Sequence, residues 1–186
     1  MSKLKRAVFL DRDGTINIEK RYLWRSEDFE FLAGVPQALA RLQKAGFILV
    51  IVTNQSGVAR GYYTLSDVDQ LHEYMKQQLI SFNVTLAGIY ICPHHPEGVP
   101  GGAFTMECSC RKGQPGMLLQ AAEDLNIDLT QSYMIGDKLS DIEAGYRAGC
   151  SPMLVTSGHY SELGDVPDYC PDIFAGVGDA VEYILR

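Results

Sequence analysis

The stretch Phe9-Leu10-Asp11-Arg12-Asp13-Gly14-Thr15-Ile16-Asn17 decides the fold. It continues an apolar run that begins at Ala7 and is short enough for a fully buried strand, and it places two carboxylates directly before a glycine. Side chains at i and i+2 of an extended segment point the same way, so we expect Asp11 and Asp13 to face one crevice. Two like charges this close need a cation or a proton between them. An EF-hand calcium loop is disfavoured, because it would place glycine sixth and glutamate twelfth, where this chain has Tyr22.

Hydrophobic periodicity outside this stretch predicts an α/β fold with a parallel sheet. Apolar strands alternate with amphipathic helices, which is the pattern of consecutive βαβ units. Segment 17–31 has no clear period and is predicted to be a loop or a flap over the site. Ser66 and Asp69 read as a capping box for one of the helices. The remaining strands are expected at 47–52, 88–91, 133–137 and 152–155, and the helices at 35–45, 68–82, 115–125, 142–149 and 177–185.

Length and composition predict one folded domain, 1–186, with no repeat and no linker. The 186 residues are 46% hydrophobic, but no apolar run approaches the roughly 18 to 20 residues of a membrane span, and the N-terminus lacks a signal-length apolar segment. A cytoplasmic protein is therefore expected. A formal net charge of -7 argues against a nucleic-acid partner, because no basic stripe offsets the repulsion of phosphates.

Three of the five cysteines cluster with a histidine in a loop rich in Gly and Pro. Cys92-x-His94 and Cys108-x-Cys110 form two close pairs, and three sulfurs with one imidazole favour tetrahedral zinc. Four protein ligands leave no open position, so we expect a structural site that folds loop 92–112. Two alternatives stay open: His95 could replace His94, and one of the cysteines could be an ordinary buried thiol. An odd number of cysteines makes a disulfide framework improbable.

Polar side chains follow two further predicted strands at their carboxyl ends, where open α/β sheets bind ligands. Thr53-Asn54-Gln55-Ser56-Gly57 follows the second strand, and Asp137 ends the fourth. The crevice beyond Asp11 is therefore expected to have several polar walls.

Four segments, in chain order, resemble the four motifs of the haloacid dehalogenase superfamily of phosphotransferases. They are Asp11-Arg12-Asp13-Gly14-Thr15, Thr53, Lys112, and Gly136-Asp137-Lys138-Leu139-Ser140-Asp141. The runs 53–61, 92–96 and 108–112 further resemble the zinc-loop branch of this superfamily, which includes phosphatases of heptose bisphosphate and of histidinol phosphate. The resemblance implies a three-layer Rossmann-like fold with a parallel central sheet and no large cap domain.

The resemblance also implies roles for individual residues. Asp11 is expected to be the nucleophile that becomes an aspartyl phosphate, and Asp13 to protonate the leaving oxygen and then deprotonate water, with its pKa poised near neutrality. Mg2+ is expected between Asp11, the backbone carbonyl of Asp13, and Asp137. Thr53 and Lys112 are expected to hold the phosphoryl group. Substrate binding is implied for Glu19, Lys20, Arg21, Tyr22, Thr53, Asn54, Gln55, Ser56, Arg111, Lys112 and Lys138.

Asp141 and Arg60 carry weaker expectations, and the residues that follow Lys112 depart from the family pattern. Asp141 is expected behind the residues that touch the metal, and Arg60 is a weaker candidate for substrate contact. The superfamily branch follows its Arg-Lys pair with Pro-x-Pro-Gly, whereas here Gly113-Gln114 precedes Pro115-Gly116. The aim of Lys112 is therefore less restricted by the chain.

The implied function is Mg2+-dependent removal of the C7 phosphate of D-glycero-D-manno-heptose 1,7-bisphosphate by a monomer. The product would feed ADP-heptose and lipopolysaccharide core or S-layer glycan synthesis. The alternative is a phosphatase of histidinol phosphate or of another small sugar phosphate. A signalling receiver is disfavoured because no aspartate ends the strand at 47–52, and a polynucleotide phosphatase is disfavoured by the acidic charge.

Overall fold

A parallel sheet forms the centre of the computed structural model, which describes residues 4–158, 165–170 and 172–186. Within these residues the sheet has six strands in the order β3-β2-β1-β4-β5-β6, and every pairing is parallel. The expected single domain 1–186 thus includes three short stretches outside the described residues. The strands are β1 (Ala7–Leu10), β2 (Ile48–Asn54), β3 (Leu86–Cys92), β4 (Tyr133–Gly136), β5 (Ser151–Val155) and β6 (Ile173–Phe174).

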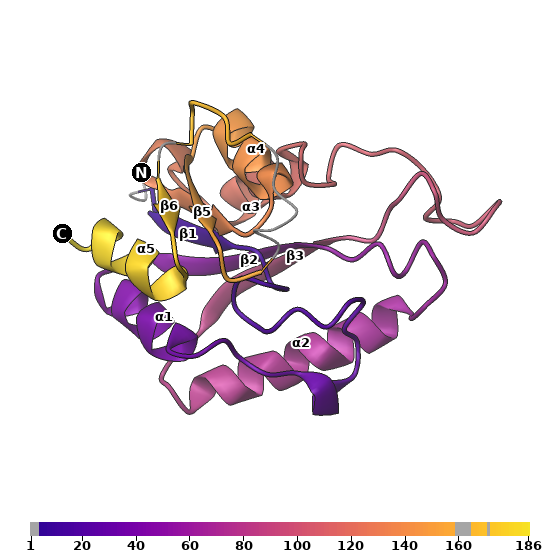
Figure 1. Cartoon of the computed structure of the whole chain (residues 1–186), viewed down its shortest axis with the longest axis horizontal. Coiled ribbons are helices and arrows are strands. Elements are labelled where there is room, and N and C mark those ends of the chain that lie inside the picture. Colours follow the sequence, from indigo (N-terminus) through magenta and orange to yellow (C-terminus); the bar gives the residue numbers. More distant parts are fainter. Residues whose placement is uncertain (1–3, 159–164, 171) are drawn as a thin grey trace.

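Helices cover both faces of the sheet and make three layers (Figure 1). The helices α1 (Val35–Lys44), α2 (Leu65–Ile80) and α5 (Val177–Ile184) lie on one face, and α3 (Gly116–Leu125) and α4 (Leu139–Ala148) on the other. Short 3-10 helices occupy Ser26–Asp28 and Leu129–Gln131. No helix in the described part of the chain is both long enough and apolar enough to span a bilayer.

The side chains of β1 alternate between the two faces of the sheet and so contribute to the hydrophobic core on both faces. Val8 and Leu10 belong to the buried cluster under α1, α2 and α5, whereas Ala7 and Phe9 belong to the cluster under α3 and α4. All four side chains are fully buried, because a strand covered on two faces buries both of its side-chain rows.

The strand order places the ends of β1, β2 and β4 side by side. The chain builds outward from β1 to β3, then returns across the sheet and continues from β4 to β6. The order therefore reverses between β1 and β4, and open α/β sheets bind ligands at such a switch point.

The predicted alternation of helices and strands is confirmed, with one addition and one correction. Gly46 follows the C-cap residue of α1, Ala45, with a positive φ of 87°, and α3 begins at Gly116 directly after Pro115. β6 was not predicted, because a strand of two residues shows no periodicity. The predicted capping box is wrong: Thr64 caps α2 together with Asp67, so the helix begins at Leu65.

This cap gives a test of the start of α2. The Thr64 side chain accepts a hydrogen bond from the Asp67 N–H at 3.2 Å, and Asp67 accepts one from the Thr64 N–H at 2.7 Å. Thr64→Ala should lower the free energy of unfolding by about 1 kcal/mol, whereas the control Ser66→Ala should change it little. Urea denaturation measures both, and a larger loss for Ser66→Ala would contradict the assigned cap.

Candidate active site

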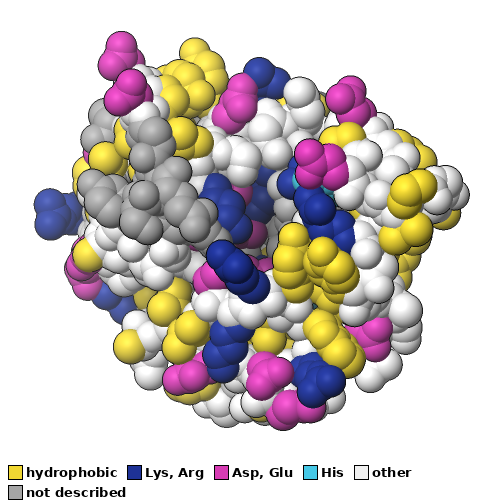
Figure 2. Space-filling view, turned by 45° about the vertical axis from the view of Figure 1, so that its right-hand side comes forward, with side chains coloured by type: hydrophobic (Ala, Val, Ile, Leu, Met, Phe, Trp, Pro, Cys, Tyr) yellow, Lys and Arg dark blue, Asp and Glu magenta, His cyan; other side chains and the backbone are white. Residues whose placement is uncertain are grey.

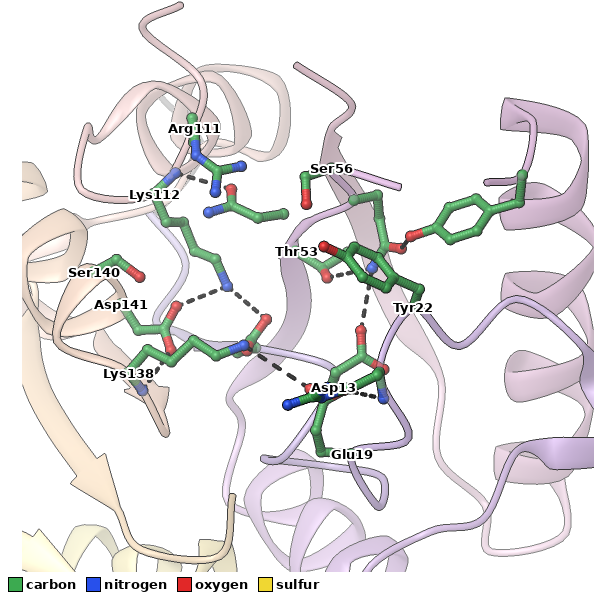
Figure 3. A pocket seen from close by; sticks show the side chains of 15 residues that line it. Asp13, Glu19, Tyr22, Thr53, Ser56, Arg111, Lys112, Lys138, Ser140 and Asp141 are labelled. Carbon is green, nitrogen blue, oxygen red and sulfur yellow. Dashed lines mark hydrogen bonds and ion pairs between the residues drawn. The ribbon is translucent and has the colours of Figure 1, made fainter. Parts of the chain in front are cut away.

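A pocket of about 430 Å³ opens at the carboxyl end of the sheet. Figure 2 shows Lys and Arg side chains gathered around a hollow with acidic side chains in its depth. Figure 3 shows Lys112, Asp141 and Lys138 on one side of the pocket, and Thr53 and Tyr22 on the other. The lining residues are Asp11, Asp13, Glu19, Arg21, Tyr22, Thr53, Asn54, Gln55, Ser56, Tyr63, Arg111, Lys112, Lys138, Ser140 and Asp141.

A buried lysine joins the walls of this pocket. Lys112 Nζ lies 2.5 Å from Asp11 Oδ1 and 2.8 Å from Asp141 Oδ1, and it donates a hydrogen bond to the Val52 carbonyl at 2.8 Å. Burial lowers the pKa of Lys112, but the charges of Asp11 and Asp141 outweigh burial and hold the pKa above its usual value. The ammonium is therefore charged and fixed by three different segments.

Three buried carboxylates lie close together at this cation. One oxygen from each of Asp11, Asp137 and Asp141 lies within 4.8 Å of the others. Burial raises the pKa of Asp11 to about 8; Lys112 opposes this shift, whereas Asp141 and Asp137 add to it. The Asp141 carboxylate lines the pocket and contacts Lys112, and its place behind the residues that bind the metal stays a prediction.

The Asp137 carboxylate is tightly enclosed. A Cβ on Gly14 would lie 2.4 Å from Asp137 Oδ2, and a Cβ on Gly158 would lie 2.1 Å from it. Thr15 Oγ1 donates a hydrogen bond to the other oxygen at 3.4 Å. An excess of buried negative charge with fixed oxygen donors suits a hard divalent cation such as Mg2+, and the residues present therefore fit the expected metal.

Asp13 lies outside this carboxylate cluster and has its own set of donors. Arg12 forms an ion pair with it at 2.8 Å, Asn17 Nδ2 donates to Oδ1 at 3.0 Å, and Gln55 Nε2 donates to Oδ2 at 3.3 Å. Burial raises the pKa of Asp13, but the Arg12 charge and these hydrogen bonds outweigh burial and hold the pKa below its ordinary value. Without metal and substrate, these neighbours therefore favour the carboxylate form of Asp13. A pKa near neutrality stays a prediction for the site with its cation bound.

Residues at the carboxyl end of β2 link Asp13 to the loop that carries Lys112. Gln55 Nε2 also donates to Thr53 Oγ1 at 2.8 Å, and Asn54 Oδ1 accepts from the Lys112 backbone N–H at 3.0 Å. Thr53 is almost fully buried at the end of its strand. One short segment thus connects Asp13 to the loop that carries Lys112.

The rim of the pocket carries the cations seen in Figure 2. Lys138 Nζ lies 3.9 Å from Glu19, and burial lowers its pKa less than the carboxylates of Asp11, Asp137 and Asp141 raise it. Arg111 donates a hydrogen bond to the His94 carbonyl at 3.3 Å, which links the rim to the cysteine loop.

Consecutive non-glycine residues in the left-handed conformation shape one edge of the rim. Arg21 has a φ of 45° and Tyr22 a φ of 53°, and such backbone costs about 1 to 3 kcal/mol per residue. Both side chains line the pocket, but Lys20 does not. The Lys20 ammonium donates a hydrogen bond to the Asp28 carbonyl at 2.6 Å, and its contact with substrate stays a prediction.

The four predicted zinc ligands do converge. Sγ atoms of Cys92, Cys108 and Cys110 lie 3.2 to 3.5 Å apart, and His94 Nδ1 lies 3.3 Å from Cys110 Sγ. His94 is the histidine of this cluster, whereas His95 contacts Arg60 and accepts a hydrogen bond from the Glu97 N–H. Thus His94, and not His95, lies beside the three sulfurs, whereas Arg60 lies against His95 and outside the pocket lining.

Sequence reasoning missed three residues around Asp13. Arg12 and His72 are buried, and the Tyr63 hydroxyl donates to Gln55 Oε1 at 2.8 Å. His72 lies on the buried side of α2 beside Leu71 and Met75, so no local pattern marks it. Arg12 belongs to the motif Asp11-Arg12-Asp13-Gly14-Thr15, but the motif alone does not show that its side chain points into the protein.

Comparisons with known proteins agree with this geometry. A family model described as HAD-hydrolase-like matches residues 109–176. The D-glycero-beta-D-manno-heptose-1,7-bisphosphate 7-phosphatase of Haemophilus ducreyi is 51% identical over 156 residues, 83% of this chain and 85% of that protein. The Escherichia coli K12 protein of the same name is 48% identical over 159 residues, 85% of this chain and 83% of that protein. A D,D-heptose 1,7-bisphosphate phosphatase from B. bronchiseptica, crystallised with magnesium and phosphate, superposes with a TM-score of 0.86 at 31% identity, covering 97% of this chain and 98% of that one.

The fold and the site define a phosphomonoesterase of the haloacid dehalogenase-like class. Within that class, the chain belongs to the family of the D-glycero-beta-D-manno-heptose-1,7-bisphosphate 7-phosphatases.

The ion pairs of Lys112 can be tested through stability. Lys112→Gln leaves two buried carboxylates without their cation, and the free energy of unfolding should fall by about 3 to 5 kcal/mol. Lys76→Gln is a matched control, because its ion pair with Glu73 at 2.6 Å is exposed and should contribute about 1 kcal/mol or less. Urea denaturation without added metal measures both. Equal losses would mean that Lys112 does not hold the site together.

Proposed function

We propose that this protein removes the C7 phosphate of D-glycero-beta-D-manno-heptose 1,7-bisphosphate, the substrate in the names of its relatives. The observation that carries the proposal is the Asp11–Lys112 pair at the base of a pocket with further cations at its rim. One phosphate fits beside Lys112, and Arg21, Arg111 and Lys138 are available to the second. In a chain of net charge -7, such a concentration of cations supports a doubly phosphorylated ligand.

Phosphoryl transfer then begins with attack by Asp11 on the C7 phosphorus. Mg2+, held by Asp11, Asp137 and the Asp13 carbonyl, would supply positive charge against the repulsion between carboxylate and phosphate. Lys112 holds Asp11 and the phosphoryl oxygens in line, and Thr53 donates a hydrogen bond to the same group. The bond from phosphorus to the C7 oxygen breaks as the bond to Asp11 forms.

Asp13 moves the proton in both halves of the reaction. Its pKa is low without substrate, but a phosphate beside it disfavours the carboxylate and favours proton uptake. Asp13 gives this proton to the departing C7 oxygen. It then takes a proton from the water that attacks the aspartyl phosphate, so that inorganic phosphate leaves and Asp11 is restored.

We further propose that loop 92–112 holds a structural Zn2+ through Cys92, His94, Cys108 and Cys110, within a single-domain enzyme that acts as a monomer. The close approach of three sulfurs and one imidazole nitrogen supports this assignment. Arg111 and Lys112 follow Cys110 at the end of this loop. A zinc ion that orders the loop would therefore also fix the two cations that contact the substrate.

Substrate preference tests the proposal directly. Purified protein with Mg2+ should release phosphate from heptose 1,7-bisphosphate with a higher kcat/KM than from histidinol phosphate. Preference for histidinol phosphate would contradict the proposed substrate while leaving the phosphatase class intact.

The nucleophile has its own test in the same assay. Asp11→Asn should lower phosphate release to background, because the amide cannot form the aspartyl phosphate, whereas the exposed Asp69→Asn should retain full activity. Substantial turnover by Asp11→Asn would require another nucleophile.

Metal analysis tests the loop assignment. Cys108→Ser should lose zinc and show increased proteolysis within 92–112. Cys150→Ala removes a buried thiol outside the cluster and should keep one zinc per chain. Full zinc occupancy in Cys108→Ser would refute this ligand set.

A further inference from the structure

We propose that Arg12 is a positioning residue that fixes the Asp13 carboxylate from behind, and that His72 on α2 anchors Arg12 in that position. The proposal rests on the proton-transfer role given to Asp13 under the proposed function. It concerns two buried residues that the mechanism above does not use.

Arg12 is fully buried and does not line the pocket. Its Nη2 donates to Asp13 Oδ2 at 2.8 Å and to the Leu23 carbonyl at 3.0 Å, and its Nε lies 3.2 Å from both Asp13 oxygens. A planar guanidinium that meets a carboxylate along one edge restricts the plane of that carboxylate. Arg12 therefore acts on Asp13 from the side away from the substrate.

His72 fixes the opposite end of the guanidinium. Arg12 Nη1 lies 3.1 Å from His72 Nε2, and a guanidinium can only donate, so Nε2 accepts and the ring proton lies on Nδ1. Burial, and then the Arg12 charge, lowers the pKa of His72 to about 3. A neutral histidine on α2 thus gives the buried cation an acceptor without adding a second charge.

The same network reaches Thr53. Gln55 Oε1 accepts from Arg12 at 3.4 Å and from Tyr63, while its Nε2 donates to Asp13 and Thr53. Both polar side-chain atoms of Gln55 are therefore hydrogen-bonded, and Gln55 links Asp13 to Thr53. Because these side chains share partners, a shift of Arg12 would move Asp13 relative to the phosphorus.

The test uses the leaving group as a probe of Asp13. An alkyl oxygen needs a proton as it departs, whereas p-nitrophenolate leaves readily without one. His72→Leu removes the acceptor and should lower kcat/KM for the sugar phosphate on the order of 10-fold to 100-fold, but lower it much less for p-nitrophenyl phosphate. His72→Gln offers an amide oxygen in place of Nε2 and should recover most of the loss. Equal losses on both substrates, or no loss on either, would overturn the proposal.

Two further variants separate positioning from folding. Tyr74→Phe lies on the same helix and should behave as the wild type with both substrates. Arg12→Lys keeps the charge but loses the planar fork, and should show the same selective loss; if His72→Leu fails to fold, this variant decides by the same criteria. If the wild type hydrolyses another sugar phosphate faster than heptose 1,7-bisphosphate, the variants are assayed with that ester. An error in the proposed substrate and an error in the role of Arg12 then give different results.

Discussion

The site depends on the interactions that the Lys112 ammonium group makes. This group joins Asp11 after β1, the Val52 carbonyl within β2 and Asp141 in α4. A buried cation with three fixed acceptors has little freedom, and an unpaired carboxylate at this depth would be costly. The ends of three elements far apart in the sequence are thereby held at one distance from each other.

The sheet order makes this convergence possible. Because β1 lies between β2 and β4, the residues that follow these strands meet at a single edge, where no strand continues. The cysteine loop carries two of the cations of the pocket, because Arg111 and Lys112 follow Cys110 directly. Arg111 also donates a hydrogen bond to the His94 carbonyl. The loop therefore contributes both to the base of the pocket, through Lys112, and to its rim, through Arg111.

Much of this arrangement could be predicted, because strand periodicity and strand-end carboxylates are local signals. The motif residues Asp11, Thr53 and Lys112 line one pocket, and four metal-ligand side chains in the loop converge. The direction in which individual side chains point in the folded chain could not be predicted. Lys20 turns toward Asp28, Asp141 reaches the pocket from the first turn of α4, and Arg12 packs inward against a histidine on a helix 60 residues later. Neither burial nor the partners that lower the pKa of Asp13 can be read from spacing alone.

The most direct test of the central claim is a crystal structure of the protein with Mg2+ and beryllofluoride, a mimic of a phosphoryl group bound to a carboxylate. We expect beryllium bound to a carboxylate oxygen of Asp11, with a fluoride in hydrogen-bond contact with Lys112 Nζ and the metal shared with Asp137. Beryllofluoride bound to Asp13 or Asp141, or found away from Lys112, would contradict the assignment of Asp11 and Lys112 as the centre of the reaction.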